Sequence, residues 1–165
     1  MNLKYRQAVE SDLESLVDLW TEFDDFFLEM GSDYYKDYKS KSSEYREAIK
    51  KLNFSSIPSI WTIVCEDNEV IVGHISYMLR YMAELPPRFA LYLSEVYVKD
   101  DYRSSGIGKR FFELIKAEAK TLEADCVYWN VWDRNTRARR FYERIGAEYL
   151  RDSDSDELFM KLKVE

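Results

Sequence analysis

The residues with the clearest chemical potential lie between Leu91 and Lys109, in the run LYLSEVYVKDDYRSSGIGK. An apolar, strand-like stretch leads into a charged turn, and an amphipathic helix is predicted to begin at Gly106-Ile107-Gly108. The first N–H groups of a helix have no partner inside the helix, and the helix dipole adds partial positive charge there. Glycine also lets the main chain approach an anion closely. The run therefore predicts a site for a cofactor that carries a pyrophosphate.

The spacing of the glycines narrows the class of cofactor. The sequence has no GxxxxGK[ST] phosphate loop, and a GxGxxG dinucleotide fingerprint fails at Phe111. The pattern that fits is [R/Q]-x-x-G-x-[G/A], from Arg103 to Gly108, which resembles the acetyl-CoA site of the GNAT superfamily of N-acetyltransferases. A second stretch, from Asn135 to Tyr142, resembles the N-x-x-A-x-x-F-Y signature of the same superfamily. On these two motifs the chain is identified as a member of that superfamily.

The resemblance implies an α/β fold of the GNAT type, with a central, mixed but mostly antiparallel sheet and helices on both faces. The fourth and fifth strands would splay apart and leave a wedge, and a bulge in the fourth strand would free main-chain amides there. We expect residues 1–165 to form one domain. The hydrophobic periodicity agrees with this fold. Strands are predicted at 3–8, 60–66, 70–78, 90–98, 126–132, 147–151 and 158–164, and helices at 11–30, 43–52, 106–122 and 136–145.

The resemblance also implies how acetyl-CoA, the expected cofactor, would be held. The main chain of Val96, Tyr97 and Val98 would pair with the pantetheine arm, and an N–H near Val96 would polarise the thioester carbonyl. Asn135, followed by Ala138 in the same motif, would bond to pantetheine or cap the helix that starts at Thr136. The pyrophosphate would lie at the loop and helix start, on Arg103, Ser104, Ser105, Gly106, Ile107, Gly108 and Lys109.

Two residues are predicted to carry the chemistry. Tyr142 would give a proton or hydrogen bond to the departing thiolate, because a phenol stays protonated at neutral pH. Glu95 is the leading prediction for the base that removes a proton from the acceptor ammonium, and Tyr92 and Glu84 are weaker ones. The run around Glu95 most resembles that of diamine (spermidine/spermine-type) acetyltransferases. Those enzymes have two adjacent acids there, whereas this chain has Ser94 before Glu95.

Acidic and aromatic side chains of the first two helices and their loop suit a cationic acceptor, through charge pairing and cation–π contact. Residues 7–35 contain nine acids and no Lys or Arg. Asp24, Asp25, Glu84, Tyr92 and Glu95 are the predicted acceptor-binding residues. Further acids and aromatics of the first helix and the loop after it are expected to contribute, namely Glu22, Glu29, Asp33, Tyr34, Tyr35 and Tyr38. The last predicted hairpin adds the acids Asp152, Asp154, Asp156 and Glu157.

Composition limits the other partners. A net charge of −7 disfavours general nucleic-acid binding, and the apolar runs are too short for a membrane span. The N-terminus does not resemble a signal peptide, so a cytoplasmic location is expected. Cys65 and Cys126 are predicted to be reduced and buried, His74 to be a structural strand residue, and no metal site is expected. A homodimer is a family-level expectation.

The sequence is therefore consistent with three hypotheses for the function. The leading one is an acetyl-CoA-dependent transfer of an acetyl group to a small cationic amine, such as a polyamine, by direct attack in a ternary complex. The second is acetylation of a protein lysine or N-terminus by the same motifs. The third is a non-catalytic acyl-CoA-binding module, against which Tyr142 and Glu95 argue because a pure binder needs neither.

Overall fold

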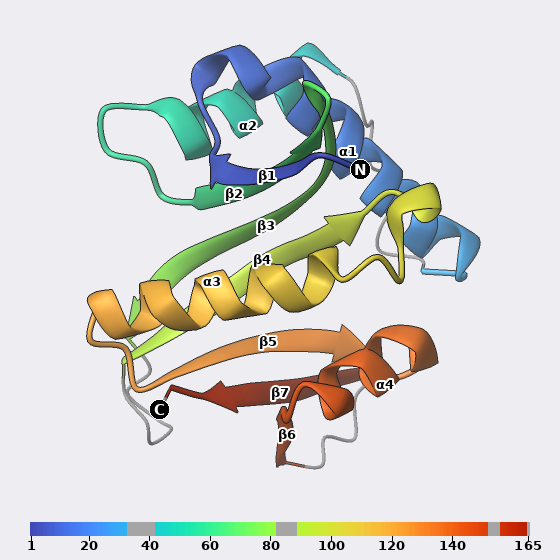
Figure 1. Cartoon of the computed structure of the whole chain (residues 1–165), viewed down its shortest axis with the longest axis vertical. Helices are drawn as coiled ribbons and strands as arrows, with labels where there is room; N and C mark the ends of the chain where they lie inside the picture. Colours follow the sequence, from blue (N-terminus) through green and yellow to red (C-terminus); the bar gives the residue numbers. More distant parts are fainter. Residues whose placement is uncertain (33–41, 82–88, 152–155, 165) are drawn as a thin grey trace. The chain divides into compact units, whose positions relative to one another are not determined.

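A computed structural model of the chain describes residues 1–32, 42–81, 89–151 and 156–164 (Figure 1). Its helices and strands follow the order predicted from the sequence, with boundaries that differ by a few residues. The strands are β1 (Leu3–Gln7), β2 (Trp61–Asp67), β3 (Val70–Tyr81), β4 (Phe89–Val98), β5 (Cys126–Trp132), β6 (Glu148–Arg151) and β7 (Glu157–Lys163). The α-helices are α1 (Leu13–Glu29), α2 (Ser43–Phe54), α3 (Ile107–Thr121) and α4 (Thr136–Arg144).

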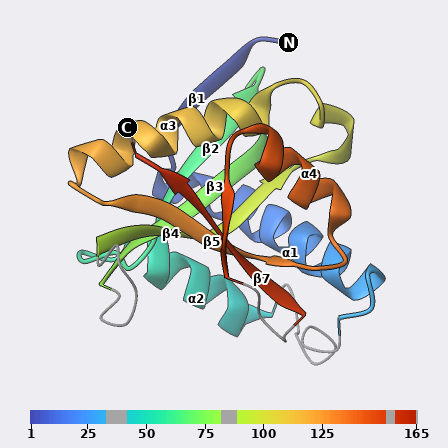
Figure 2. The same cartoon turned by 90° about the horizontal axis from the view of Figure 1, so that it is seen from below.

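Within the described ranges, the strands form one seven-stranded sheet in the order β1-β2-β3-β4-β5-β7-β6. The pairs β1–β2, β5–β7 and β6–β7 are antiparallel, whereas β4 and β5 are parallel. The register of the parallel pair joins Ala90 to Cys126 and Tyr92 to Tyr128, at the beginning of both strands. The last strand, β7, lies between β5 and β6 (Figure 1), and Figure 2 shows β5 and β7 from below. This arrangement confirms the predicted mixed sheet.

The chain divides into two compact units. The first unit comprises Met1–Ser76 and Glu95–Gly108, and the second comprises Tyr77–Ser94 and Lys109–Glu165. The strands β3 and β4 and the helix α3 therefore each contribute residues to both units. Each unit has fully buried apolar side chains: Leu16, Ile49, Val64 and Ile75 in the first, and Phe111, Ile115, Val127 and Met160 in the second.

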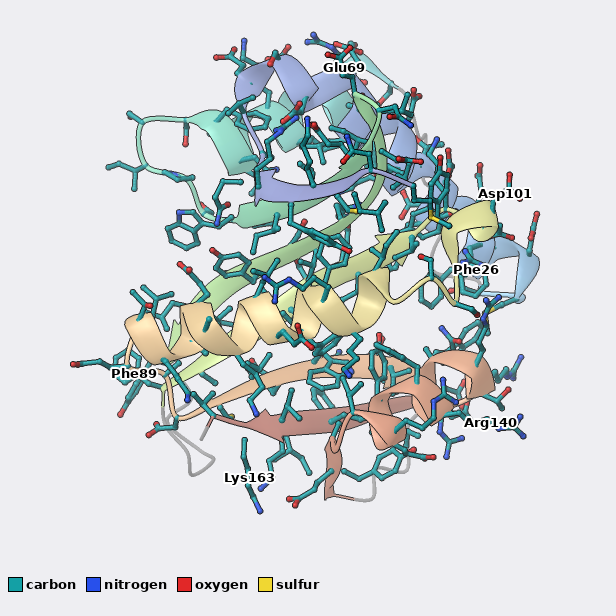
Figure 3. All side chains as sticks on the ribbon, in the orientation of Figure 1. Phe26, Glu69, Phe89, Asp101, Arg140 and Lys163 are labelled. Atoms are coloured by element: carbon teal, nitrogen blue, oxygen red, sulfur yellow. The ribbon has the colours of Figure 1, made fainter. Side chains whose placement is uncertain are left out.

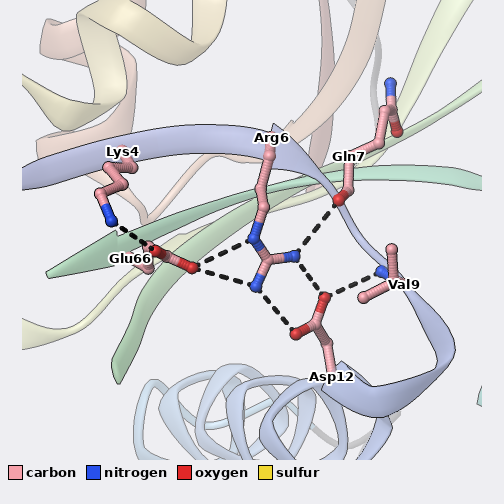
Figure 4. Close-up of polar contacts among 6 residues, drawn as sticks. All are labelled: Lys4, Arg6, Gln7, Val9, Asp12 and Glu66. Carbon is pink, nitrogen blue, oxygen red and sulfur yellow. Dashed lines mark hydrogen bonds and ion pairs between the residues drawn. The ribbon is translucent and has the colours of Figure 1, made fainter. Parts of the chain in front are cut away.

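Ser11 and Glu14 have the spacing of a capping box, but the start of α1 is arranged differently. A short 3-10 turn at Glu10–Asp12 precedes the helix, and the Asp12 carboxylate accepts a hydrogen bond from the Val9 N–H at 2.8 Å. Arg6 of β1 donates two hydrogen bonds to the same carboxylate, at 2.6 and 3.0 Å, and also pairs with Glu66 (Figure 4). Asp12 therefore replaces Ser11 in organising this turn, because only Asp12 can also neutralise the guanidinium.

Gly31 and Ser32 follow the end of α1, where glycine is the residue type most often found. Gly31 has a φ of 86°, a left-handed conformation that glycine adopts without strain. Its N–H donates to the Leu28 carbonyl at 2.9 Å, and the Ser32 N–H donates to the Phe27 carbonyl at 3.0 Å. These two bonds form a Schellman motif, which satisfies the last carbonyls of the helix. No helix in the described residues combines the length and the apolar character needed to cross a membrane.

Candidate active site

A glutamate–histidine pair joins strands β3 and β4 within the first unit. The Glu95 Oε2 atom of β4 is 3.1 Å from the His74 Nε2 atom of β3. The side chain of His74 has no exposed surface, whereas that of Glu95 remains 17% exposed. The neighbouring Gly73 allows the two strands to approach, since a Cβ there would lie 2.8 Å from the Tyr97 carbonyl oxygen. The two side chains therefore form a pair that solvent reaches from the Glu95 side.

Burial changes the protonation of both partners. It raises the pKa of Glu95 to about 8 and lowers the pKa of His74 to about 3. The imidazole is therefore neutral throughout the physiological range, and Glu95 changes its charge close to that range. A carboxylate with such a pKa is suited to accept a proton near neutral pH, which an ordinary glutamate does poorly. This is the electrostatic property expected of a general base.

A second buried carboxylate, Asp24 of α1, belongs to the same unit. Its side chain accepts a hydrogen bond from the Tyr45 hydroxyl of α2 at 2.8 Å, and the residue is 5% exposed. Burial raises the pKa of Asp24 to about 6, against the effect of the Tyr45 hydrogen bond, and the charges of Glu95 and Asp25 raise it further. Asp24 and Glu95 therefore lie in one electrostatic environment, which favours a cation when either carboxylate is ionised.

Aromatic rings border this environment. The ring of Trp20 is 6.4 Å from that of Tyr45 and 6.3 Å from the imidazole of His74. On the other side, the Tyr97 ring is 6.5 Å from His74. We define the acid–aromatic cluster as Trp20, Asp24, Tyr45, His74, Glu95 and Tyr97. Its composition, two carboxylates among aromatic rings, is one that binds organic ammonium groups.

The remaining predicted acceptor residues have other environments. Asp25 and Glu29 are exposed on α1, and Glu22 forms an ion pair with Lys99 at 3.2 Å. Tyr92 belongs to the second unit, where Arg80 lies 4.9 Å from its ring and the Tyr128 ring lies at 5.0 Å. Asp156 and Glu157 are exposed. Glu84 lies outside the described residues, as do Asp33, Tyr34, Tyr35, Tyr38, Asp152 and Asp154.

The loop after β4 has the backbone conformation that an anion site requires. Ser104 and Gly106 have φ values of 67° and 92°, so their N–H groups depart from the regular direction of a strand or helix. Within the described part of the first unit, the N–H groups from Ser104 to Gly108 have no hydrogen-bond acceptor. A Cβ added to Gly106 would meet no protein atom within 4 Å, so the space beside this loop is open. These features fit a diphosphate.

Arg103 differs from the expected phosphate ligand. Its main-chain N–H already donates to the Asp100 carbonyl at 3.1 Å, and its side-chain Nε donates to the Val98 carbonyl at 2.9 Å. The guanidinium also pairs with the Asp100 carboxylate and lies over the ring of Phe26, which Figure 3 labels. Arg103 therefore fixes the loop to the end of β4, and we remove its N–H from the predicted donors.

The second unit holds the other predicted motif. Tyr142 is 9% exposed and packs against Trp129, Phe141 and Phe112, with ring centroids 4.9, 5.4 and 5.6 Å away. Burial raises the pKa of the Tyr142 hydroxyl above its ordinary value, so the phenol keeps its proton. The hydroxyl has no hydrogen-bond partner among the residues that the structure describes. Tyr142 is therefore a neutral phenol on a rigid aromatic support.

Asn135 caps α4, one of its two predicted roles. Its Oδ1 atom accepts a hydrogen bond from the Ala138 N–H at 3.1 Å. Ala138 therefore contributes to the helix cap through its main-chain N–H. Ile107 of the first unit is buried, and Lys109 of the second is exposed.

Sequence reasoning missed Tyr45 and the contact of His74 with Glu95. His74 and Glu95 are 21 positions apart in the sequence, and no motif connects them. Tyr45 stands in the first turn of α2, where only packing against α1 makes it a partner of Asp24. The available signal was the presence of a single histidine in a chain whose predicted chemistry needs a base.

The chain is similar in sequence to known acetyltransferases. The model of the acetyltransferase (GNAT) family matches residues 16–147. Over 157 residues, the chain is 27% identical to a thialysine N-epsilon-acetyltransferase of Bos taurus, covering 90% of this chain and 86% of that enzyme. Over 86 residues, it is 29% identical to an L-ornithine N5-acetyltransferase of Arabidopsis thaliana. That match covers 52% of this chain but only 37% of the plant enzyme's length.

A solved structure shares the fold over the whole chain. It is the PaiA N-acetyltransferase of Thermoplasma acidophilum in complex with coenzyme A, with a TM-score of 0.68 and 20% identity. The match covers 99% of each chain. Since the family model covers most of the sequence and the sheet has the expected order, the chain belongs to the acetyltransferase (GNAT) family, the acetyl-CoA-dependent N-acetyltransferases.

Proposed function

We propose that this chain transfers the acetyl group of acetyl-CoA to the primary amine of a small cationic molecule, such as a diamine or polyamine. The observation that carries the proposal is that the buried Asp24 and the partly exposed Glu95 influence each other electrostatically in an environment lined by aromatic rings. Two relatives, named for acting on ornithine and thialysine, support a small amine as acceptor. We propose residues 1–165 as one functional domain.

In this proposal the acid–aromatic cluster binds and deprotonates the acceptor. Asp24 attracts the ammonium, and Asp25, exposed on the same helix, adds to the negative field. Glu95 then accepts a proton from the ammonium, which has an ordinary pKa of about 10 and cannot attack while charged. The high pKa of Glu95 makes this proton transfer less unfavourable than transfer to an ordinary carboxylate. Glu84 and Tyr92 remain weaker predictions for acceptor binding.

The other predicted residues would hold the cofactor, which supplies an acetyl thioester when it is bound. The free N–H groups from Ser104 to Gly108 would bind its diphosphate, with the Lys109 ammonium adding positive charge. The main chain of Val96, Tyr97 and Val98 would bind the pantetheine arm, and an N–H near Val96 would donate to the thioester carbonyl. The Tyr142 hydroxyl would donate its proton to the departing sulfur.

A panel of acceptors tests this function. Coenzyme A release is measured with small diamines, amino acids with a cationic side chain, and peptides with a lysine or a free N-terminus. Small cationic amines should be acetylated most efficiently, and Asp24→Asn should raise their KM. Glu14→Gln, which alters an exposed acid of the same helix, is the matched control and should leave KM unchanged. Turnover of peptides without turnover of any free amine would contradict the proposal.

The proposal also includes a homodimer, which is a family-level expectation, and a cytoplasmic location, which is inferred from the sequence. The mass of the purified chain in solution, measured by light scattering, tests the first.

A further inference from the structure

We propose that His74 is a positioning residue, whose Nε2–H favours the ionised form of the Glu95 carboxylate and orients it for proton transfer. This inference rests on the proposed role of Glu95 as the base. His74 itself is fully buried, so it cannot meet the acceptor. It acts through the hydrogen bond to Glu95, whose N···O distance is 3.1 Å.

The two carboxylate oxygens of Glu95 have different environments, so they can have different roles. Oε2 is held by the imidazole, whereas Oε1 has no hydrogen bond to any described residue. The side chain retains 17% exposure, so one oxygen can meet an acceptor while the other is fixed. The imidazole is in turn packed near the rings of Trp20 and Tyr97, with ring centroids 6.3 and 6.5 Å away. The orientation of the carboxylate is therefore set by a packed side chain.

The other nitrogen of the imidazole identifies its tautomer. His74 Nδ1 is buried and has no hydrogen-bond partner in the part of the chain that the structure describes. A proton on Nδ1 would be a buried donor without an acceptor, whereas a bare Nδ1 leaves only a lone pair unsatisfied. The proton therefore belongs on Nε2, from which it is donated to Glu95. A doubly protonated imidazole is excluded by complete burial.

The charges around Glu95 make this hydrogen bond decisive. Asp24 of α1 is negative when ionised and opposes the charge of Glu95, and its partner Tyr45 of α2 is neutral. Two cations that follow β4 in the described chain form ion pairs with other acids: Lys99 pairs with Glu22, and Arg103 pairs with Asp100. Tyr97, on β4 itself, keeps its proton because burial raises its pKa to about 12. The His74 N–H is thus the described group that favours ionised Glu95.

The single histidine of this chain permits a direct test. Protein labelled with ¹⁵N-histidine is titrated by NMR between pH 5 and pH 10. We expect a neutral imidazole with its proton on Nε2 throughout, and an inflection in both nitrogen shifts where Glu95 titrates. The inflection should vanish in Glu95→Gln. A proton on Nδ1, an imidazolium between pH 5 and 7, or a missing inflection in the unaltered protein would overturn the proposal. This readout needs no turnover, so it stands even if the proposed reaction is wrong.

Two variants then test the consequence for catalysis. His74→Phe keeps a ring but loses the donor, so ionised Glu95 loses its hydrogen bond and the acid limb of kcat/KM should move up by about one pH unit. Activity at pH 7 should fall by about tenfold. His74→Gln, whose carboxamide N–H can replace Nε2–H, should restore the limb.

Calorimetry with acetyl-CoA checks that each variant is folded. A folded His74→Phe with an unchanged limb, or a folded His74→Gln that behaves like His74→Phe, would contradict the proposal. If His74→Phe does not fold, the ¹⁵N titration and His74→Gln decide.

Discussion

The sharpest prediction concerns the pH dependence of catalysis. Burial places the pKa of Glu95 at about 8, so about a tenth of the molecules carry the ionised base at pH 7 and about a hundredth at pH 6. If Glu95 is the base, kcat/KM should rise by about tenfold per pH unit up to pH 8 and then level off. A glutamate with an ordinary pKa would give a flat profile over the same range. Glu95→Gln should abolish the inflection and lower kcat/KM by about 10²- to 10⁴-fold at pH 8.

The assay must distinguish the titration of Glu95 from that of the acceptor, since an amine also loses a proton as the pH rises. Initial rates of coenzyme A release are measured with two diamines of the same size, one made less basic by fluorine substitution. A limb that belongs to Glu95 stays near pH 8 with both acceptors. Asp24, with a pKa of about 6, would add only a smaller inflection at lower pH. The reasoning is refuted if the limb follows the acceptor's pKa, or if Glu95→Gln retains it.

Three further predictions concern single residues. Glu95→Gln should gain stability relative to the unaltered chain at pH 9 but not at pH 4, as measured by thermal melting. The folded pKa of Glu95 lies above its ordinary value of 4.5, so the stability linked to its proton is lost as pH rises from 4.5 through 8. Tyr142→Phe should lower kcat by about 10²-fold or more with little change in melting temperature, because its ring contacts with Trp129 and Phe112 remain; an unchanged kcat would remove Tyr142 from the chemistry. Asn135→Ala should destabilise the protein by about 1 kcal/mol in urea titrations through loss of the α4 cap. If acetyl-CoA affinity is then unchanged, Asn135 has no role beyond the cap.

Much of the fold could be predicted because its signals are local. The alternation of apolar residues located the strands, and Gly31 marked the end of α1 through its positive φ. The start of α1 was predicted less well, since Ser11 and Glu14 form a capping pattern but Arg6 of β1 draws Asp12 into a competing turn. The position of β7 between β5 and β6 has no local signal, because strand order depends on packing across the sheet.

In the candidate site, too, the features with a local sequence signal were predicted and those that depend on tertiary packing were not. Motif spacing pointed to Glu95, Tyr142 and the loop from Ser104 to Gly108, because a cofactor's diphosphate demands particular backbone conformations from consecutive residues. The pattern could not show that the Arg103 N–H and side chain are already bonded within the protein. Such bonds form only after the turn at Asp100 has folded.

The sequence by itself determined the family, the order of helices and strands, and the residues able to do acid–base chemistry, since all of these depend on residue type and short spacing. Only the tertiary structure decided how those residues are tuned. It brought His74 within 3.1 Å of Glu95 and Tyr45 within 2.8 Å of Asp24, and it removed both carboxylates from most of the solvent. A pKa depends on burial and on neighbours distant along the chain, so it is a property of the folded molecule.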